Sequence, residues 1–110
     1  MEGTELAAFN IISAVGEAKS KLIEAVEQSK KGHENEVKRL ISEGNEAITR
    51  GDKEHFKLIT EDSKNKDVQF SLLLVHAEDQ LMSAEIFRDF TNQLVETNLE
   101  LFKLKEELNK

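Results

Sequence analysis

The sequence predicts an all-α protein, an antiparallel three-helix bundle whose third helix is the longest. The 110-residue chain contains no Trp, Tyr or Pro, and aromatic residues make up only 5% of it, whereas β-rich domains draw on aromatic and turn residues. Charged residues make up 34%, which is typical of amphipathic helices with solvated outer faces. A chain of this length fits one domain, so we expect residues 1–110 to form a single bundle.

The net charge and the residue types that are missing exclude several classes of function. The formal net charge is −7, and a nucleic-acid-binding protein would normally present a basic face. The chain has no cysteine, which excludes disulfides, thiol chemistry and cysteine zinc sites. Its N-terminus lacks the basic region of a signal peptide, and no apolar run approaches the ~18 residues of a membrane span. We therefore expect a cytoplasmic protein that does not bind nucleic acid.

The first helix is predicted to run from Thr4 to about Lys30. Thr4 can cap its N-terminus, and Glu5 favours the positive end of the helix dipole. The cations at 30 and 31 followed by Gly32 are a typical C-terminal signal. The predicted apolar stripe recurs at steps of three and four and comprises Phe9, Ile12, Val15, Ala18, Leu22 and Val26.

The second helix is predicted to run from about Glu34 into the fifties. Gly51 and Asp52 interrupt it and would allow a kink, or a turn before a short further helix. The apolar pattern resumes in residues 56–59, which favours a continuous, weakened helix. Residues 61–67 contain no apolar side chain and are the predicted loop. The apolar side of this helix comprises Val37, Leu40, Ile41, Ile48, Leu58 and Ile59.

The third helix is predicted to run from about Val68 to near the C-terminus, which gives an up-down-up bundle. A helix this long outruns its two partners, so its tail would project as a coiled coil or pack against other subunits. A polar gap falls at Thr97 and Asn98. The predicted apolar stripe comprises Leu72, Val75, Met82, Ile86, Phe90, Leu94, Leu101, Leu104 and Leu108.

Asp79 occupies a position on this stripe where an apolar residue is expected. Because burial of an unpaired carboxylate is costly, Asp79 needs a partner or access to water. In a symmetric oligomer several copies would converge and repel one another, and a hard cation such as Mg²⁺ would relieve that repulsion. A polar residue that sets the register of a helical interface is the alternative.

His76 precedes Asp79 by three residues and Gln80 by four, so the three are neighbours on the helix surface. A carboxylate or an amide can hydrogen-bond one ring nitrogen, which leaves the lone pair of the other free to attack an electrophile. Spacing alone favours a structural His–Asp pair without chemistry. We expect His33 and His55 to be surface histidines; the alternative for His55 is a position near His76 in the bundle.

The segment from Ser71 to Met82, Ser-Leu-Leu-Leu-Val-His-Ala-Glu-Asp-Gln-Leu-Met, carries a more specific signal. It closely resembles the signature of the lactose/cellobiose-type enzyme IIA of the bacterial phosphoenolpyruvate-dependent sugar phosphotransferase system, which has a similar His-Ala-Gln-Asp-His-Leu-Met segment. Residues 9–20 resemble the opening helix of that family, and residues 45–47 resemble part of its second helix. The resemblance extends from about residue 6 to residue 105.

The resemblance implies a phosphotransferase component that assembles as a homotrimer. His76 would accept a phosphoryl group from the carrier HPr and pass it to a cysteine of the IIB component during sugar uptake, and the membrane would be reached only through the IIC component. Asp79 would lie near the trimer axis with a bound divalent cation. Gln80, which can hydrogen-bond but cannot titrate, replaces the second histidine of the family segment, and Glu78 replaces its glutamine.

Two matters stay open at the level of sequence. A helical oligomerisation or regulatory module that kept the fold without the chemistry is the alternative function. The sequence does not identify the sugar, nor which ring nitrogen of His76 is phosphorylated.

Met82, Phe87 and Phe90 are expected in the hydrophobic core rather than around a cofactor.

Overall fold

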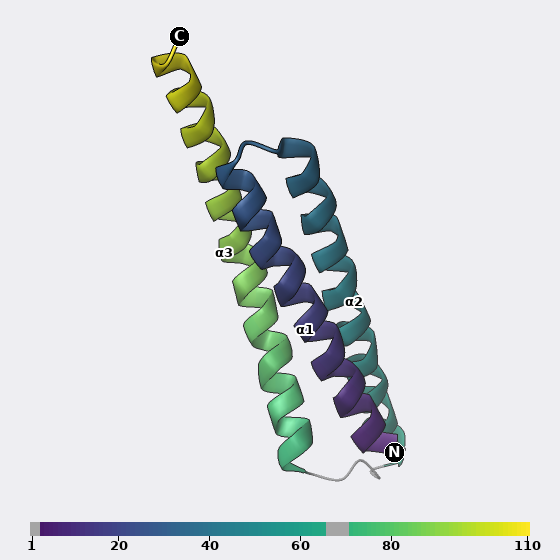
Figure 1. Ribbon diagram of the computed structural model, residues 1–110. Helices are drawn as coiled ribbons and strands as arrows, with labels where there is room; N and C mark the ends of the chain where they lie inside the picture. The colour runs from purple at the N-terminus through teal and green to yellow at the C-terminus, as the bar shows by residue number, and fades with distance from the viewer. Residues whose placement is uncertain (1–2, 66–70) are drawn as a thin grey trace.

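The computed structural model describes the backbone of residues 3–65 and 71–110, and the side chains of residues 3–61 and 71–110. Three helices account for nearly all of this part: α1 (Gly3–Lys30), α2 (Glu34–Asn65) and α3 (Leu72–Leu108). They run up, down and up in a rod of 65 × 20 × 18 Å (Figure 1). The predicted all-α bundle is confirmed for the described residues, and α3 is the longest helix and projects beyond the α1–α2 turn.

The turn between α1 and α2 forms where the sequence predicts it. Gly32 has a φ of 75°, a conformation that glycine adopts without strain and that commonly ends helices. The Gly32 amide donates to the carbonyl of Ser29. The ring of Phe102, near the end of α3, occupies the space that a Cβ at Gly32 would need. At the other end of α1, Thr4 lies inside the helix and is not its cap.

Helix α2 passes through Gly51 without a break, as predicted, and continues to Asn65. The predicted loop at 61–67 is therefore wrong for residues 61–65. These residues include no proline and no glycine, and the backbone of a helix satisfies its own hydrogen bonds whether or not its side chains are apolar. The rest of that predicted loop lies outside the described residues, as does Val68, where the third helix was expected to begin.

Helix α3 begins at Leu72 because Ser71 caps it. Ser71 has extended backbone angles, φ −148° and ψ 154°, and its Oγ accepts a hydrogen bond from the amide of Leu74 at 3.0 Å. This is the usual geometry of a serine N-cap.

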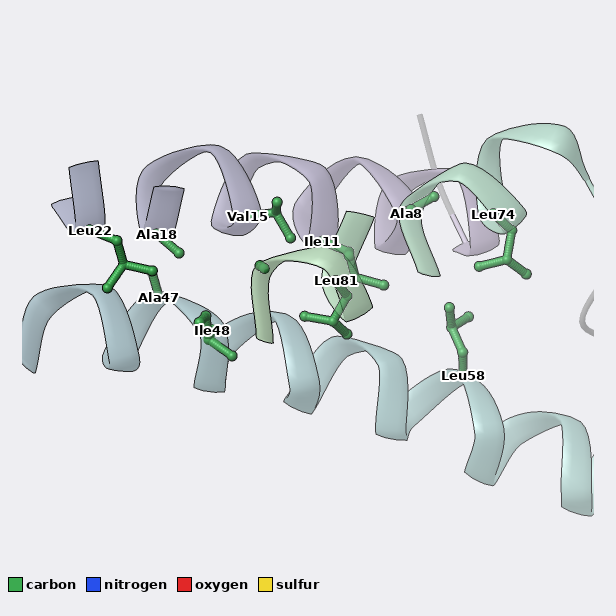
Figure 2. Close-up of a cluster of buried hydrophobic side chains, with 12 residues drawn as sticks. Ala8, Ile11, Val15, Ala18, Leu22, Ala47, Ile48, Leu58, Leu74 and Leu81 are labelled. Atoms are coloured by element: carbon green, nitrogen blue, oxygen red, sulfur yellow. The ribbon is translucent and has the colours of Figure 1, made fainter. Parts of the chain in front are cut away.

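The core lies along α1, which packs against both other helices more extensively than they pack against each other. Small side chains on α1 let the helices approach closely, and larger side chains from all three helices fill the remaining space (Figure 2). Figure 2 shows Ile11 of α1 close to Leu81 of α3, and Leu58 of α2 facing Leu74 of α3. The buried residues of this cluster are Ala8, Ile11, Val15, Ala18, Leu22, Ala47, Ile48, Leu58, Leu74, Ala77, Leu81 and Ala84.

The apolar stripe predicted for the third helix does not face this core. Its members are exposed, from 42% for Val75 to 83% for Leu72. Helix α3 carries two apolar stripes, and the one rich in alanine fits the narrow space beside α1. We call the exposed stripe the outer face of α3; it comprises Leu72, Val75, Asp79, Met82, Ile86, Phe90, Leu94, Leu101, Leu104 and Leu108.

Three further predictions also placed exposed residues in the core. Phe9, placed on the core stripe of the first helix, is 51% exposed. Ile59, placed on the apolar side of the second helix, is also exposed. Of the three residues expected in the core around position 86, only Phe87 packs against it, whereas Met82 and Phe90 are exposed.

The polar gap at Thr97 and Asn98 has a structural reason. Asn98 Nδ2 donates to Oγ of Ser29 at 2.9 Å, and the Ser29 hydroxyl donates to the carbonyl of Val26 at 2.6 Å. Ser29 is fully buried, so this pair satisfies a polar group between α1 and α3 that would otherwise be costly.

Candidate functional site

His76 lies in the second turn of α3, with its side chain exposed. Asp79, one turn further along, is also exposed. Both side chains lie where the outer face of α3 begins, between apolar residues that no other part of the described chain covers. An imidazole at this place is accessible to a second protein and is carried by a regular helix.

The ring of His76 forms no hydrogen bond with another described residue. Neither Asp79 nor Gln80 reaches it, although both lie within one turn. Gln80 forms no hydrogen bond with the imidazole in this structure, and its role as a hydrogen-bond partner of His76 stays a prediction.

Gln80 is instead bonded to α1. Nζ of Lys19 donates to Oε1 of Gln80 at 3.3 Å, and both side chains are half-buried. Sequence reasoning assigned no role to Lys19, because the contact spans 61 positions along the chain. The only signal was that Lys19 lies in residues 9–20, which resemble the opening helix of the family.

Glu78 belongs to a different part of the surface. It lies two positions after His76, so the two side chains face in different directions. Its Oε2 lies 2.8 Å from Nε2 of His55 on α2. His55 therefore lies at the junction of α2 and α3 with only 29% of its side chain exposed. It is half-buried rather than the surface histidine that was expected, and its partner Glu78 lies two positions after His76.

Two carboxyl side chains, Glu85 of α3 and Asp52 of α2, lie next to each other at the same junction. Partial burial is the main cause that raises the pKa of Glu85 above its usual range, and a hydrogen bond with the carboxyl group of Asp52 raises it further. The pair connects α2 to α3 nine positions after His76.

The described residues of one chain cannot by themselves enclose a metal ion. They contain no group of three or more His, Asp or Glu side chains that could hold one. Asp79 offers a single exposed carboxylate surrounded by apolar neighbours. A hard cation suits its oxygen ligands, but further ligands would have to come from other copies of the chain.

The sequence of the chain matches a known family over most of its length. Residues 6–98 match the family described as "PTS system, Lactose/Cellobiose specific IIA subunit". The chain belongs to this family. It is thus a lactose/cellobiose-type IIA component of the sugar phosphotransferase system, as the resemblance around His76 indicated.

Relatives of this IIA component match along nearly their whole length. The chain is 35% identical over 101 residues to the oligo-beta-mannoside-specific EIIA component of Bacillus subtilis, covering 92% of this chain and 88% of that protein. It is 30% identical over 92 residues to the lactose-specific EIIA component of Staphylococcus epidermidis, covering 84% and 88%. The fold matches the crystal structure of the PTS cellobiose-specific enzyme IIA from Bacillus anthracis with a TM-score of 0.87 and 26% identity, over 94% of each chain.

The described part of this IIA component contains no helix with the length and apolar character needed to cross a membrane.

Proposed function

We propose that this IIA component is a phosphohistidine carrier, in which His76 accepts a phosphoryl group from HPr and passes it to a cysteine of the IIB component. The observation that carries this proposal is the position of His76, which is exposed on a regular helix and free of hydrogen bonds to the described residues. A carrier needs an imidazole that two partners reach in turn, and a rigid helix holds it in one orientation for both.

The reaction is a displacement at phosphorus. The lone pair of one ring nitrogen of neutral His76 forms the new P–N bond as the P–N bond of the donor histidine breaks. The electron pair of the broken bond stays on the donor imidazole, which takes up one proton, and the His76 ring gives one up from its other nitrogen. The second transfer repeats this displacement with a cysteine thiolate as the attacking group.

The experiment is phosphoryl transfer from phosphoenolpyruvate through enzyme I and HPr, read by intact mass. We expect one acid-labile phosphoryl group on the wild-type chain and none on His76→Ala. His33→Ala is the matched control, because His33 is exposed and lies near the opposite end of the bundle in the turn after α1. Label retained on His76→Ala would refute the assignment.

We further propose that the carrier is a homotrimer with a divalent cation such as Mg²⁺ between the three Asp79 carboxylates. The outer face of α3 supports assembly, because a long apolar stripe is unfavourable in water unless another surface covers it. The cation would neutralise carboxylates that converge on the axis. Sedimentation equilibrium with and without Mg²⁺ tests both parts, and a monomer at micromolar concentration with Mg²⁺ present would refute the trimer.

A non-enzymatic helical module is the competing function, and the same outer face favours it, since assembly needs no chemistry. It predicts oligomers that HPr does not phosphorylate. The mass experiment distinguishes the two functions directly.

The proposed carrier function also implies that the protein acts in the cytoplasm, where the phosphoryl donors are.

A further inference from the structure

Lys19 reaches from α1 to the part of α3 that carries His76. Its Nζ donates to Oε1 of Gln80, and Gln80 follows His76 by one turn, on the same strip of the helix. Side chains on a helix lean toward its N-terminus and cover the turn before their own Cα. The amide of Gln80, with the ammonium group bound to it, therefore lies toward the His76 turn of α3.

Lys19 forms no salt bridge with a described residue, whereas Lys21, two positions further along α1, pairs with Glu43. Several exposed lysines also lack a salt bridge, but Lys19 is half-buried and donates its bond across to α3. Its partner is a neutral amide oxygen. The 3.3 Å separation is longer than a typical N–H···O hydrogen bond, so a stronger acceptor could displace Gln80.

We infer that Lys19 binds the phosphoryl group carried by His76. As the P–N bond to His76 forms, the ammonium group keeps its proton and donates an N–H to a non-bridging phosphoryl oxygen, in place of or in addition to Gln80. Lys19 is then a catalytic residue, because it contacts the transferred group. Gln80 is a positioning residue that holds the ammonium group near the site before transfer. This inference rests on the proposed carrier function.

The chemistry of the reaction explains why such a cation is useful. Phosphoryl transfer develops charge on the three non-bridging oxygens, and catalysis consists largely of placing positive groups beside them. A lysine acts as a point charge on phosphate. Because Gln80 cannot titrate, the positive charge beside the site comes from Lys19 and does not depend on the protonation of a second histidine.

The test compares single-turnover transfer from phospho-HPr to the wild type, Lys19→Gln, Lys19→Arg and Lys21→Gln. We expect Lys19→Gln to slow transfer about 10- to 100-fold, somewhat less than the loss on removing one donor from an oxyanion hole. Lys19→Arg should restore most of the rate because it keeps the charge. Lys21→Gln, the matched control two residues away, should stay within about twofold. A wild-type rate for Lys19→Gln would overturn the inference.

A measurement on the wild-type protein tests the inference even if Lys19→Gln fails to fold. NMR of the Lys19 ammonium group should show a clear change when His76 becomes phosphorylated, and an unchanged signal would overturn the inference. A ³¹P titration gives a second readout that a structural role would not move. The phosphoryl group should titrate at higher pH in Lys19→Gln than in the wild type, because the neighbouring cation favours its dianion.

The two proposals fail in distinguishable ways. If wild-type protein takes no label, or if His76→Ala takes it, the carrier function fails and the inference fails with it. If labelling depends on His76 but transfer and ³¹P titration are unaffected by Lys19→Gln, only the inference fails.

Discussion

The two faces of α3 differ in what their apolar residues do. The inner face, including Leu74, Ala77 and Leu81, is buried against α1 and α2. The outer face carries larger side chains, and Phe90, for example, is 71% exposed. The inner face supplies the buried core of one chain, whereas the outer face is largely exposed and borders the candidate site. On one helix, the core and the candidate site therefore lie on different faces.

The largest difference between the faces should appear in the stability of one chain. Leu81 is buried and its neighbour Met82 is exposed. We expect Leu81→Ala to lower the free energy of unfolding by about 2–5 kcal/mol, because it leaves a cavity. At protein concentrations where the chain is monomeric, Met82→Ala should cost less than about 0.5 kcal/mol. Urea unfolding at several protein concentrations measures both, and equal losses would contradict the assignment of the faces.

A charge on the outer face should affect assembly and leave the helices intact. Phe90→Glu places a carboxylate on the exposed stripe. We expect it to weaken self-association at least tenfold, about 1.4 kcal/mol, without loss of helical circular dichroism. Sedimentation equilibrium measures the association. Arg88→Glu, a charge reversal two residues away and off the outer face, is the control. If Phe90→Glu associates as strongly as the wild type, the outer face of α3 is not part of the interface.

Gly16 of α1 and Gly51 of α2 lie within helices but differ in their surroundings, which sharpens the comparison further. A Cβ at Gly51 would lie 3.0 Å from Cδ1 of Leu81 on the inner face, whereas a Cβ at Gly16 would meet nothing within 4 Å. Gly16→Ala should raise the free energy of unfolding by about 0.5–1 kcal/mol through helix propensity. Gly51→Ala should gain less or lose stability, because the tight contact opposes the same propensity. An equal gain in the free energy of unfolding at both sites would mean that the Leu81 side chain moves aside at little energetic cost.

The smallest expected effect concerns Glu85, at the junction of α2 and α3. Its pKa is raised by partial burial and by Asp52, so the folded chain holds this proton more tightly than the unfolded chain does. Stability therefore falls as the pH rises from the usual carboxyl range through the raised pKa. Glu85→Gln should stabilise the chain above that range by less than about 1 kcal/mol and have little effect below it. Unfolding between about pH 4 and about pH 8 measures this, and Asp52→Asn should act similarly.

The helices were predictable because their signals are local. The turn at Gly32, the continuity of α2 through Gly51 and the excess length of α3 follow from propensity and spacing. The inward face of α3 was not predictable from the largest apolar residues, because this helix has two apolar stripes and alanine fits the closer helix contact. The loop prediction failed at residues 61–65 because polar residues also form solvated helical turns.

The residues of the candidate site also differ in whether a local sequence pattern predicts them. Asp79 and Gln80 neighbour His76 on one helix, so spacing alone places them together. Lys19 joins this group only through the packing of α1 on α3, which no local pattern reveals. For a site that draws on two helices, local spacing therefore predicts only the residues of one helix, and the cation Lys19 on the other helix was missed.

The short connection at residues 31–33 also has a consequence for how the chain folds. It lets α1 and α2 make their contacts between residues close in sequence, whereas α3 meets α1 across separations such as 61 and 69 positions. Local contacts form with the smaller entropic cost, so the α1–α2 hairpin should form first and α3 should dock later. During synthesis the hairpin also leaves the ribosome first. His76 thus becomes part of an ordered surface only in the last step of folding.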